Sequence, residues 1–177
     1  HSSTVAFTLE SGQARLCFDG GGHCVYTAGP GEDFRFAADG SDGCVFLKKS
    51  HLGIPTVIGA PGPCSASVQP TSDQTIINLP YKARSYRHGT LLFRLAGRTG
   101  GIHTVYEIGV DDYLKGISEV PESWPSEAIK TQVVVSRSYA SRTALDRGDQ
   151  TSFDQARRDE CFCNLRDDTS DQVFRGW

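Results

Sequence analysis

The sequence of 177 residues predicts an α+β fold, with a β-rich region in residues 1–79 and a strand–helix–helix core in residues 80–177. Two patterns support this division. Short, alternating apolar runs broken by glycine and proline fill the first region, as is typical of β-strands. After residue 110, apolar side chains instead recur at three- and four-residue steps, which indicates helices. A chain of this length can bury a hydrophobic core without the help of metals.

The β-rich region is expected to contain short strands in STVAFTL, ARLCF and later runs, with turns at glycine and proline clusters. The three consecutive glycines at 20–22 have no helix after them, so we interpret them as a hairpin connection and not as a phosphate-binding loop. Two more strands, GTLLFRLA and GIHTVYEI, are expected to form a hairpin around residues 98–101.

Four of the six cysteines lie in the β-rich region and predict two disulfides made in an oxidising compartment. Three pairings are possible. We favour Cys17 with Cys24 and Cys44 with Cys64; buried free thiols are the alternative.

The other two cysteines, Cys161 and Cys163, are separated by one residue. A disulfide between them is not expected, because so short a spacing strains the bridge. No metal site is predicted, since the sequence shows no partner pair at a standard zinc spacing. Zinc would require a nearby histidine, for which the candidates are His51, His88 and His103.

Composition excludes some classes of protein. A formal net charge of −3 gives no reason to expect nucleic-acid binding. No apolar run approaches the roughly 20 residues that span a bilayer. The chain begins at His1 and contains no methionine, which suggests a removed export signal or a trimmed chain and favours an extracytoplasmic location.

The core is expected to contain two helices. Asp111 can cap a short helix from Asp112 to about Ser118, which places Glu119 at a helix C-terminus. A second helix of about six turns is expected to begin at Ser123 or Ser126 and to end at Gly148. The polar tail is expected to include one last strand, DQVF.

The segment YEIGVDDYLKGISEVPESWPSEAIKTQVVVSRSYASRTA resembles the core signature of the SpoIID/LytB family of peptidoglycan enzymes. In that signature a strand leads to E-D-Y-L-x-G-V, followed by a glutamate before Met-Pro, Ser-Trp-Pro and E-A-L-K-A-Q-A-V-A-A-R-T-Y-A. Near the end, DDTSDQVFRG resembles the family's D-x-T-x-x-Q-V-Y-x-G. Val120 replaces the methionine of the signature, and the resemblance does not place the first eighty residues.

The resemblance implies a lytic transglycosylase that cleaves peptidoglycan glycan strands and uses no cofactor, with Glu119 as its single acid/base. One carboxyl suffices, because the sugar's own C6 hydroxyl takes the place of water. Trp124 would stack on a sugar, and Gln132, Arg137 and Tyr139 would hydrogen-bond the substrate. The alternatives are structural: Trp124 in a core or helix cap, and Arg137 in an ion pair with Glu127 or an aspartate.

Other functions fit the same resemblance. The chain is alternatively a non-catalytic glycan-binding protein that enhances a cell-wall amidase, or a structural component of the cell envelope. Family domains continue beyond Gln-Val-Tyr-x-Gly, so the core resembles a truncated domain, and a second chain supplying the missing part is a further candidate partner. Some relatives bind zinc through a His-Cys pair at the positions of Ser170 and Asp171, where this sequence has no such ligands.

Overall fold

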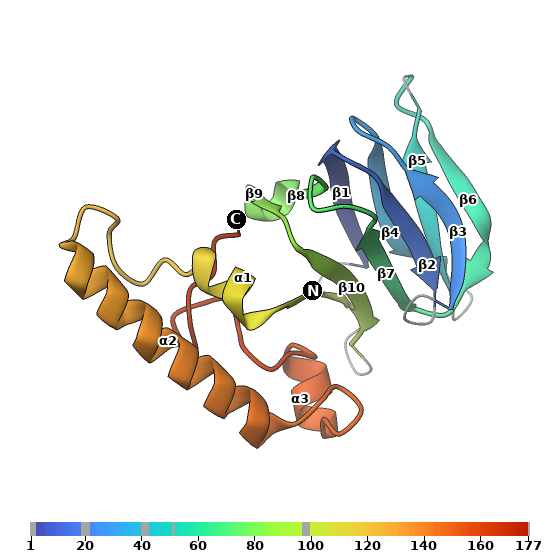
Figure 1. Ribbon diagram of the computed structural model, residues 1–177. Coiled ribbons are helices and arrows are strands. Elements are labelled where there is room, and N and C mark those ends of the chain that lie inside the picture. The colour runs from blue at the N-terminus through green and yellow to red at the C-terminus, as the bar shows by residue number, and fades with distance from the viewer. Residues whose placement is uncertain (1–2, 19–21, 40–42, 51, 97–99, 177) are drawn as a thin grey trace. The chain divides into compact units, whose positions relative to one another are not determined.

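The computed structural model describes residues 3–18, 22–39, 43–50, 52–96 and 100–176 (Figure 1). It is α+β with a β-rich start, so the predicted fold class is confirmed. The chain forms two compact units, His1–Glu107 and Ile108–Trp177. The division into domains at residues 79 and 80 stays a prediction, whereas the compact units meet at residues 107 and 108.

The described residues of the first unit form two antiparallel sheets and include a short 3-10 helix, η2. The six-stranded sheet has the order β6-β5-β4-β1-β8-β9, and the five-stranded sheet has the order β11-β10-β7-β2-β3. The elements are β1 Thr4–Ser11, β2 Ala14–Phe18, β3 His23–Ala28, β4 Asp33–Ala38, β5 Cys44–Lys49, β6 Pro55–Gly62, β7 Ser65–Pro70, β8 Ile76–Leu79, η2 Pro80–Lys82, β9 Arg84–Tyr86, β10 Gly89–Leu95 and β11 Ile102–Ile108.

Neighbouring strands form the two hairpins expected from the sequence. β2 and β3 pair antiparallel up to Phe18 and His23, and residues 19–21, where the sequence predicted part of the connection, lie outside the described residues. β10 and β11 are likewise neighbours in the five-stranded sheet, with residues 97–99 outside the described part.

Aromatic rings from both sheets fill the core between them. Phe36 of β4 stacks on Phe93 of β10 at 4.7 Å between ring centroids, and Phe18 of β2 lies 5.3 Å from Phe46 of β5. Phe7 of β1 joins the two groups, because its ring lies 5.6 Å from Phe93 and 6.4 Å from Phe46. These contacts follow from the alternation along each strand, which turns every second side chain to the inner face.

Two disulfides join segments of this unit, as predicted. Cys17 and Cys24 are opposite each other in the β2–β3 pair, with their Cα atoms 3.8 Å apart. Cys44 bonds to Cys64, 20 residues further along the chain. The β2–β3 register pairs Cys17 with Cys24, and Cys64 lies two residues beyond Gly62, the strand partner of Cys44. Both pairings are those that we favoured from the sequence.

The second unit contains the helices α1 Val110–Lys115, α2 Ser126–Arg147 and α3 Gln155–Glu160 (Figure 1). α1 is shorter than expected: its N-cap is Gly109, and Asp111 lies inside its first turn and does not cap it. α2 matches the prediction, with Pro125 at its N-cap and Gly148 at its C-cap. No helix of the described residues is long and apolar enough to cross a membrane.

α3 was not expected from the sequence. Its N-cap is Asp154, whose side chain accepts a hydrogen bond from the Arg157 N–H. The predicted strand DQVF is wrong, because only Phe174 pairs, in an isolated antiparallel bridge with Ile117. The bridge does not extend into a strand, because neither neighbouring amide pairs with a strand. The Asp171 N–H donates to the Asp168 carbonyl, and the Val173 N–H donates to the Glu119 side chain.

Candidate active site

Glu119 lies in an irregular segment beyond α1, and the expected helix C-terminus at this residue is wrong. α1 ends at Lys115, and the Gly116 N–H turns back to the Tyr113 carbonyl. The chain then runs beside the C-terminal tail. The Ser118 N–H donates to the Val173 carbonyl at 3.0 Å, and the Arg175 N–H donates to the Gly116 carbonyl at 2.9 Å. The C-terminal tail therefore lies beside Glu119, and the glutamate is not at the end of a helix.

The carboxylate of Glu119 accepts a hydrogen bond through Oε1 from the Val173 N–H. Its other oxygen, Oε2, has no hydrogen-bond partner among the residues that the structure describes, and the side chain is exposed. One oxygen is thus held by the backbone, and the other is available to a bound molecule.

Gly116 allows the tail to approach closely. A Cβ atom at this position would lie 2.3 Å from the Phe174 ring, which no real contact permits. The ring in turn stacks on Tyr113, with centroids 5.3 Å apart and planes 20° from parallel. This small aromatic cluster fixes Phe174 directly beside the segment that carries Glu119.

Tyr113 adds a polar contact to the same cluster. Its hydroxyl donates to Gln172 Oε1 at 2.9 Å, and both side chains are buried. Burial, and after it the nearby carboxylates, raises the pKa of the Tyr113 phenol well above its usual value. The phenol is therefore a hydrogen-bond donor at any physiological pH, and it positions Gln172 without taking part in proton transfer.

Asp171 connects the tail to α2. Its carboxylate accepts two hydrogen bonds from the Arg147 guanidinium, at 2.9 and 3.0 Å, and one from the Tyr139 hydroxyl at 2.9 Å. The Arg166 N–H donates to it at 2.8 Å. Burial alone would raise the pKa of Asp171, but these hydrogen bonds, led by those from Arg147, outweigh burial and lower it to about 2. The carboxylate is therefore ionised throughout the physiological pH range.

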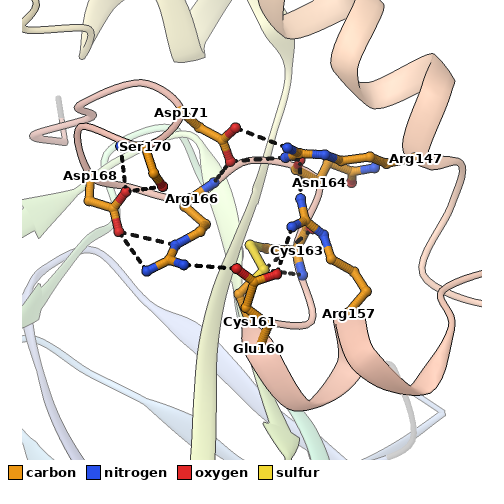
Figure 2. The surroundings of a disulfide bond; sticks show 10 residues. All are labelled: Arg147, Arg157, Glu160, Cys161, Cys163, Asn164, Arg166, Asp168, Ser170 and Asp171. Carbon is orange, nitrogen blue, oxygen red and sulfur yellow. Dashed lines mark hydrogen bonds and ion pairs between the residues drawn. A yellow bond between two sulfur atoms is a disulfide. The ribbon is translucent and has the colours of Figure 1, made fainter.

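A disulfide between Cys161 and Cys163 lies in the loop before Asp171 (Figure 2). The expectation that these cysteines would not bond to each other is wrong. Phe162 between them adopts a left-handed backbone with φ of 55°, which brings the two Cα atoms to 5.2 Å. An extended chain would separate them by about 6.6 Å. The Phe162 ring packs at 6.1 Å from Phe153, a contact that stabilises the unusual turn.

Two arginines attach this disulfide loop to its surroundings, as Figure 2 shows. Arg157 donates through Nε to the Cys163 carbonyl at 2.8 Å, and through its terminal nitrogen to the Asn164 carbonyl at 3.0 Å. Arg147 donates to the same Asn164 carbonyl as well as to Asp171. The disulfide loop and the Asp171 contact thus share one hydrogen-bond network.

The disulfide also bears on the zinc alternative. Both sulfurs are bonded to each other, so neither is a thiolate available to a metal. No group of three or more His, Cys, Asp or Glu side chains with metal-binding geometry occurs among the described residues. His51, one of the histidines considered, lies outside the described residues.

The structure places the five site residues predicted from the sequence in different surroundings. Glu119 is held by the tail, and Tyr139 reaches the same tail through Asp171. Gln132 points along α2 to Ser136 at 3.1 Å. Arg137 pairs with Asp111 at 3.6 Å, and its side chain is 60% exposed. Trp124, in the turn before α2, is 49% exposed and so is not a core residue.

The sequence reasoning did not assign a role to Asp171, Gln172 or Asp167. The Asp167 carboxylate accepts a hydrogen bond from the Phe174 N–H at 3.1 Å. Phe174 follows Val173, whose N–H binds Glu119. All three residues lie in DDTSDQVFRG, the second motif of the resemblance. This motif is about 50 residues from Glu119 in the sequence, so the sequence alone did not reveal that the two segments are in contact.

Comparisons with known proteins found one family and one relative that match part of the chain. The model of the SpoIID family, described as stage II sporulation protein, matches residues 98–177. An uncharacterized protein of Brachyspira hyodysenteriae is 35% identical over 69 residues, a match that covers 38% of this chain and 18% of the relative. No solved structure matches the chain significantly.

Residues 98–177 therefore match the SpoIID family model, in agreement with the resemblance found in the sequence. This family segment contains both Glu119 and the tail motif that contacts it. It supports a role related to the cell wall. The chain spans less than a fifth of the length of the relative that it matches.

Proposed function

We propose that this protein is a lytic transglycosylase that cleaves the glycan strands of peptidoglycan, with Glu119 as its acid and base. The observation that carries the proposal is the arrangement of this one carboxyl in the SpoIID-family segment. Its side chain is exposed to a ligand, while the Val173 N–H binds one of its two oxygens. A general acid or base must be both reachable and held in a defined orientation.

The reaction proceeds in two proton transfers through the same carboxyl. Protonated Glu119 donates its proton to the glycosidic oxygen as the bond from that oxygen to C1 of the muramyl sugar breaks. The resulting carboxylate then accepts the proton of the C6 hydroxyl of the same sugar, whose oxygen bonds to C1. The product is a 1,6-anhydro-muramyl end, no water is consumed, and the glutamic acid is regenerated.

Four further residues are proposed to bind the glycan. The exposed indole of Trp124 offers an apolar face for a sugar ring. Arg137 lies on the exposed side of α2, where its guanidinium can bind the lactyl carboxylate of a muramyl sugar. The hydroxyl of Tyr139 and the amide of Gln132 supply hydrogen bonds to the sugar, in exchange for their contacts to Asp171 and Ser136.

Such an enzyme would act outside the cytoplasm. Disulfides persist in oxidising compartments, and this chain contains three among its described residues. We propose a secreted or envelope-associated location, with glycan strands as substrate. The further partners proposed are a cell-wall amidase and a second chain that completes the domain.

The test is mass spectrometry of the soluble products released from purified peptidoglycan, both with its peptide stems and without them. The wild-type chain should release fragments with anhydro-muramyl ends, which are lighter by one water than hydrolysis products. Glu119→Gln should abolish them, because the amide cannot donate the proton. Glu122→Gln is the matched control, since this exposed acid lies three residues away, and it should leave product formation unchanged.

Three other outcomes would contradict the proposal. Ordinary reducing ends in place of anhydro ends would indicate a hydrolase that activates water. If no product forms but the chain binds glycan strands, and Trp124→Ala abolishes binding, the function is that of a glycan-binding protein, as for an amidase enhancer. Failure to bind glycan at all would indicate a structural component of the envelope.

A further inference from the structure

The C-terminal tail reaches Glu119 through one anchored residue, Asp171. The side chain of Asp171 is only 4% exposed. Its carboxylate is bound by Arg147 and Tyr139, which lie about two turns apart on α2. The Arg166 N–H binds the same carboxylate from within the loop. Asp171 thus joins the loop to the longest helix of the second unit.

The three residues after Asp171 all contact the segment around Glu119. Gln172 accepts from the Tyr113 hydroxyl, the Val173 N–H donates to Glu119, and the Phe174 ring packs against Gly116. A residue in an extended chain advances the backbone by about 3.3 Å. A shift of Asp171 by even a fraction of that distance would therefore misalign the Val173 N–H with the carboxylate.

We propose that Asp171 is a positioning residue for Glu119, whose ion pair with Arg147 fixes the tail so that the Val173 N–H orients the glutamate carboxyl. The inference deepens the proposed function and rests on it for the role of Glu119. Asp171 itself touches neither the carboxyl nor a substrate. Its effect passes through the backbone of the two residues that follow it.

The physical reason lies in the exposure of Glu119. An exposed glutamate samples several rotamers, because its side chain has three rotatable bonds and few neighbours. A backbone N–H is a rigid donor only where its own peptide is fixed. Oε1 is held by Val173, the side chain is exposed, and Oε2 has no hydrogen-bond partner among the described residues, so Oε2 can exchange protons with a bound glycan. Catalytic geometry is sensitive to displacements of about 1 Å, so loss of the anchor should lower turnover.

The first measurement is amide hydrogen exchange of the full chain, resolved at Val173. Asp171→Asn keeps the size of the side chain but removes its charge. We expect the Val173 amide to exchange about 10- to 100-fold faster, the effect of weakening hydrogen bonds to a charged group. Asp146→Asn is the matched control, because Asp146 pairs with Arg142 on the exposed side of the same helix, and it should leave this exchange rate unchanged.

Two more variants separate positioning from general stability. Tyr139→Phe removes one hydrogen bond to Asp171 and keeps the Arg147 pair, so it should accelerate Val173 exchange less than Asp171→Asn. Glu119→Ala removes the acceptor and should accelerate Val173 exchange without changing the amides of α2, whereas Glu119→Gln retains an acceptor oxygen and should have a smaller effect.

In the glycan assay, Asp171→Asn should lower kcat about tenfold and change KM less than about twofold, as expected for a group that orients the acid. Unchanged Val173 exchange in Asp171→Asn would overturn the proposal. So would equal acceleration throughout α2, since Asp171 would then stabilise the whole unit without positioning the tail. If wild type releases no anhydro product, the proposed function fails, and the exchange results still decide whether Asp171 fixes the tail.

Discussion

The two units of this protein are stabilised in contrasting ways. The first buries stacked phenylalanine rings between two sheets, and its core includes Phe36, Phe46 and Phe93, each fully buried. In the described part of the second unit the buried apolar side chains are Tyr113, Ala140, Phe153 and Phe174. α2 meanwhile exposes Val134 and Leu145. Directional contacts, through arginine, aspartate and backbone groups, hold much of the second unit together.

The difference separates stability from function. Apolar burial is non-directional, so it stabilises a fold without placing any one atom with great accuracy. Charge-assisted hydrogen bonds have preferred lengths and angles, so they can fix the tail beside Glu119. We infer that substitutions in the first unit reduce stability most, whereas substitutions in the second unit affect the candidate site at a smaller cost in stability.

The largest effect is expected from Phe36→Ala in the first unit. Phe36 is 0% exposed and stacks on Phe93, so its loss should lower the free energy of unfolding by about 3–5 kcal/mol. Urea denaturation followed by near-ultraviolet circular dichroism measures this change. Tyr81→Ala, at a side chain that is 57% exposed, is the control and should cost far less. A loss below about 1 kcal/mol for Phe36→Ala would contradict a well-packed core.

The next effect in size is expected from Gly116→Ala in the second unit. The added Cβ would lie 2.3 Å from the Phe174 ring, so the tail must move, at a cost of about 3 kcal/mol. Hydrogen exchange of residues 172–176 should accelerate, and glycan cleavage should fall. Gly109→Ala is the matched control, because a Cβ there meets nothing within 4 Å. Equal effects of the two substitutions would show that helix propensity, and not the close approach, is responsible.

A smaller effect, about 2 kcal/mol, is expected from the charge of Asp171 and should depend on pH. The folded pKa of about 2 lies below the ordinary value of 3.8, so ionisation stabilises the fold above pH 3.8 and this contribution is lost as the pH falls through 2. Denaturation of wild type and Asp171→Asn between pH 6 and pH 2 measures it. The difference between the two proteins should be largest at pH 6 and should shrink towards pH 2. A difference independent of pH would mean that shape, not charge, is what Asp171 contributes.

The smallest effect is expected from Cys161→Ser/Cys163→Ser. Because this disulfide closes so short a loop, its loss should cost only about 1.5 kcal/mol, whereas Cys44→Ser/Cys64→Ser should cost about 3 kcal/mol. Urea denaturation of both double variants gives the ranking. Hydrogen exchange should change mainly in residues 157–166 for the first pair. The reverse ranking would show that the Cys161–Cys163 bridge supports more than its own loop.

The sequence by itself determined the features that depend on neighbouring residues. Alternation within the β-rich region and the stop at Gly148 specify local backbone geometry, and the strand-rich start and the end of α2 predicted from them are confirmed. The turn expected at residues 61–63 is wrong in part, because β6 extends to Gly62. The sequence favoured the pairings Cys17–Cys24 and Cys44–Cys64 without deciding among the three possibilities, and the structure contains these two. The family signature around Glu119 is likewise a contiguous pattern.

Only the tertiary structure decided how the candidate site is assembled. Phe162 adopts a left-handed backbone that spacing alone does not reveal, and this makes the Cys161–Cys163 bridge possible. The contact of Val173 with Glu119 joins residues 54 positions apart. Local patterns carry no information on such pairs, because the free energy that selects them arises only when distant segments exclude water and satisfy one another's polar groups.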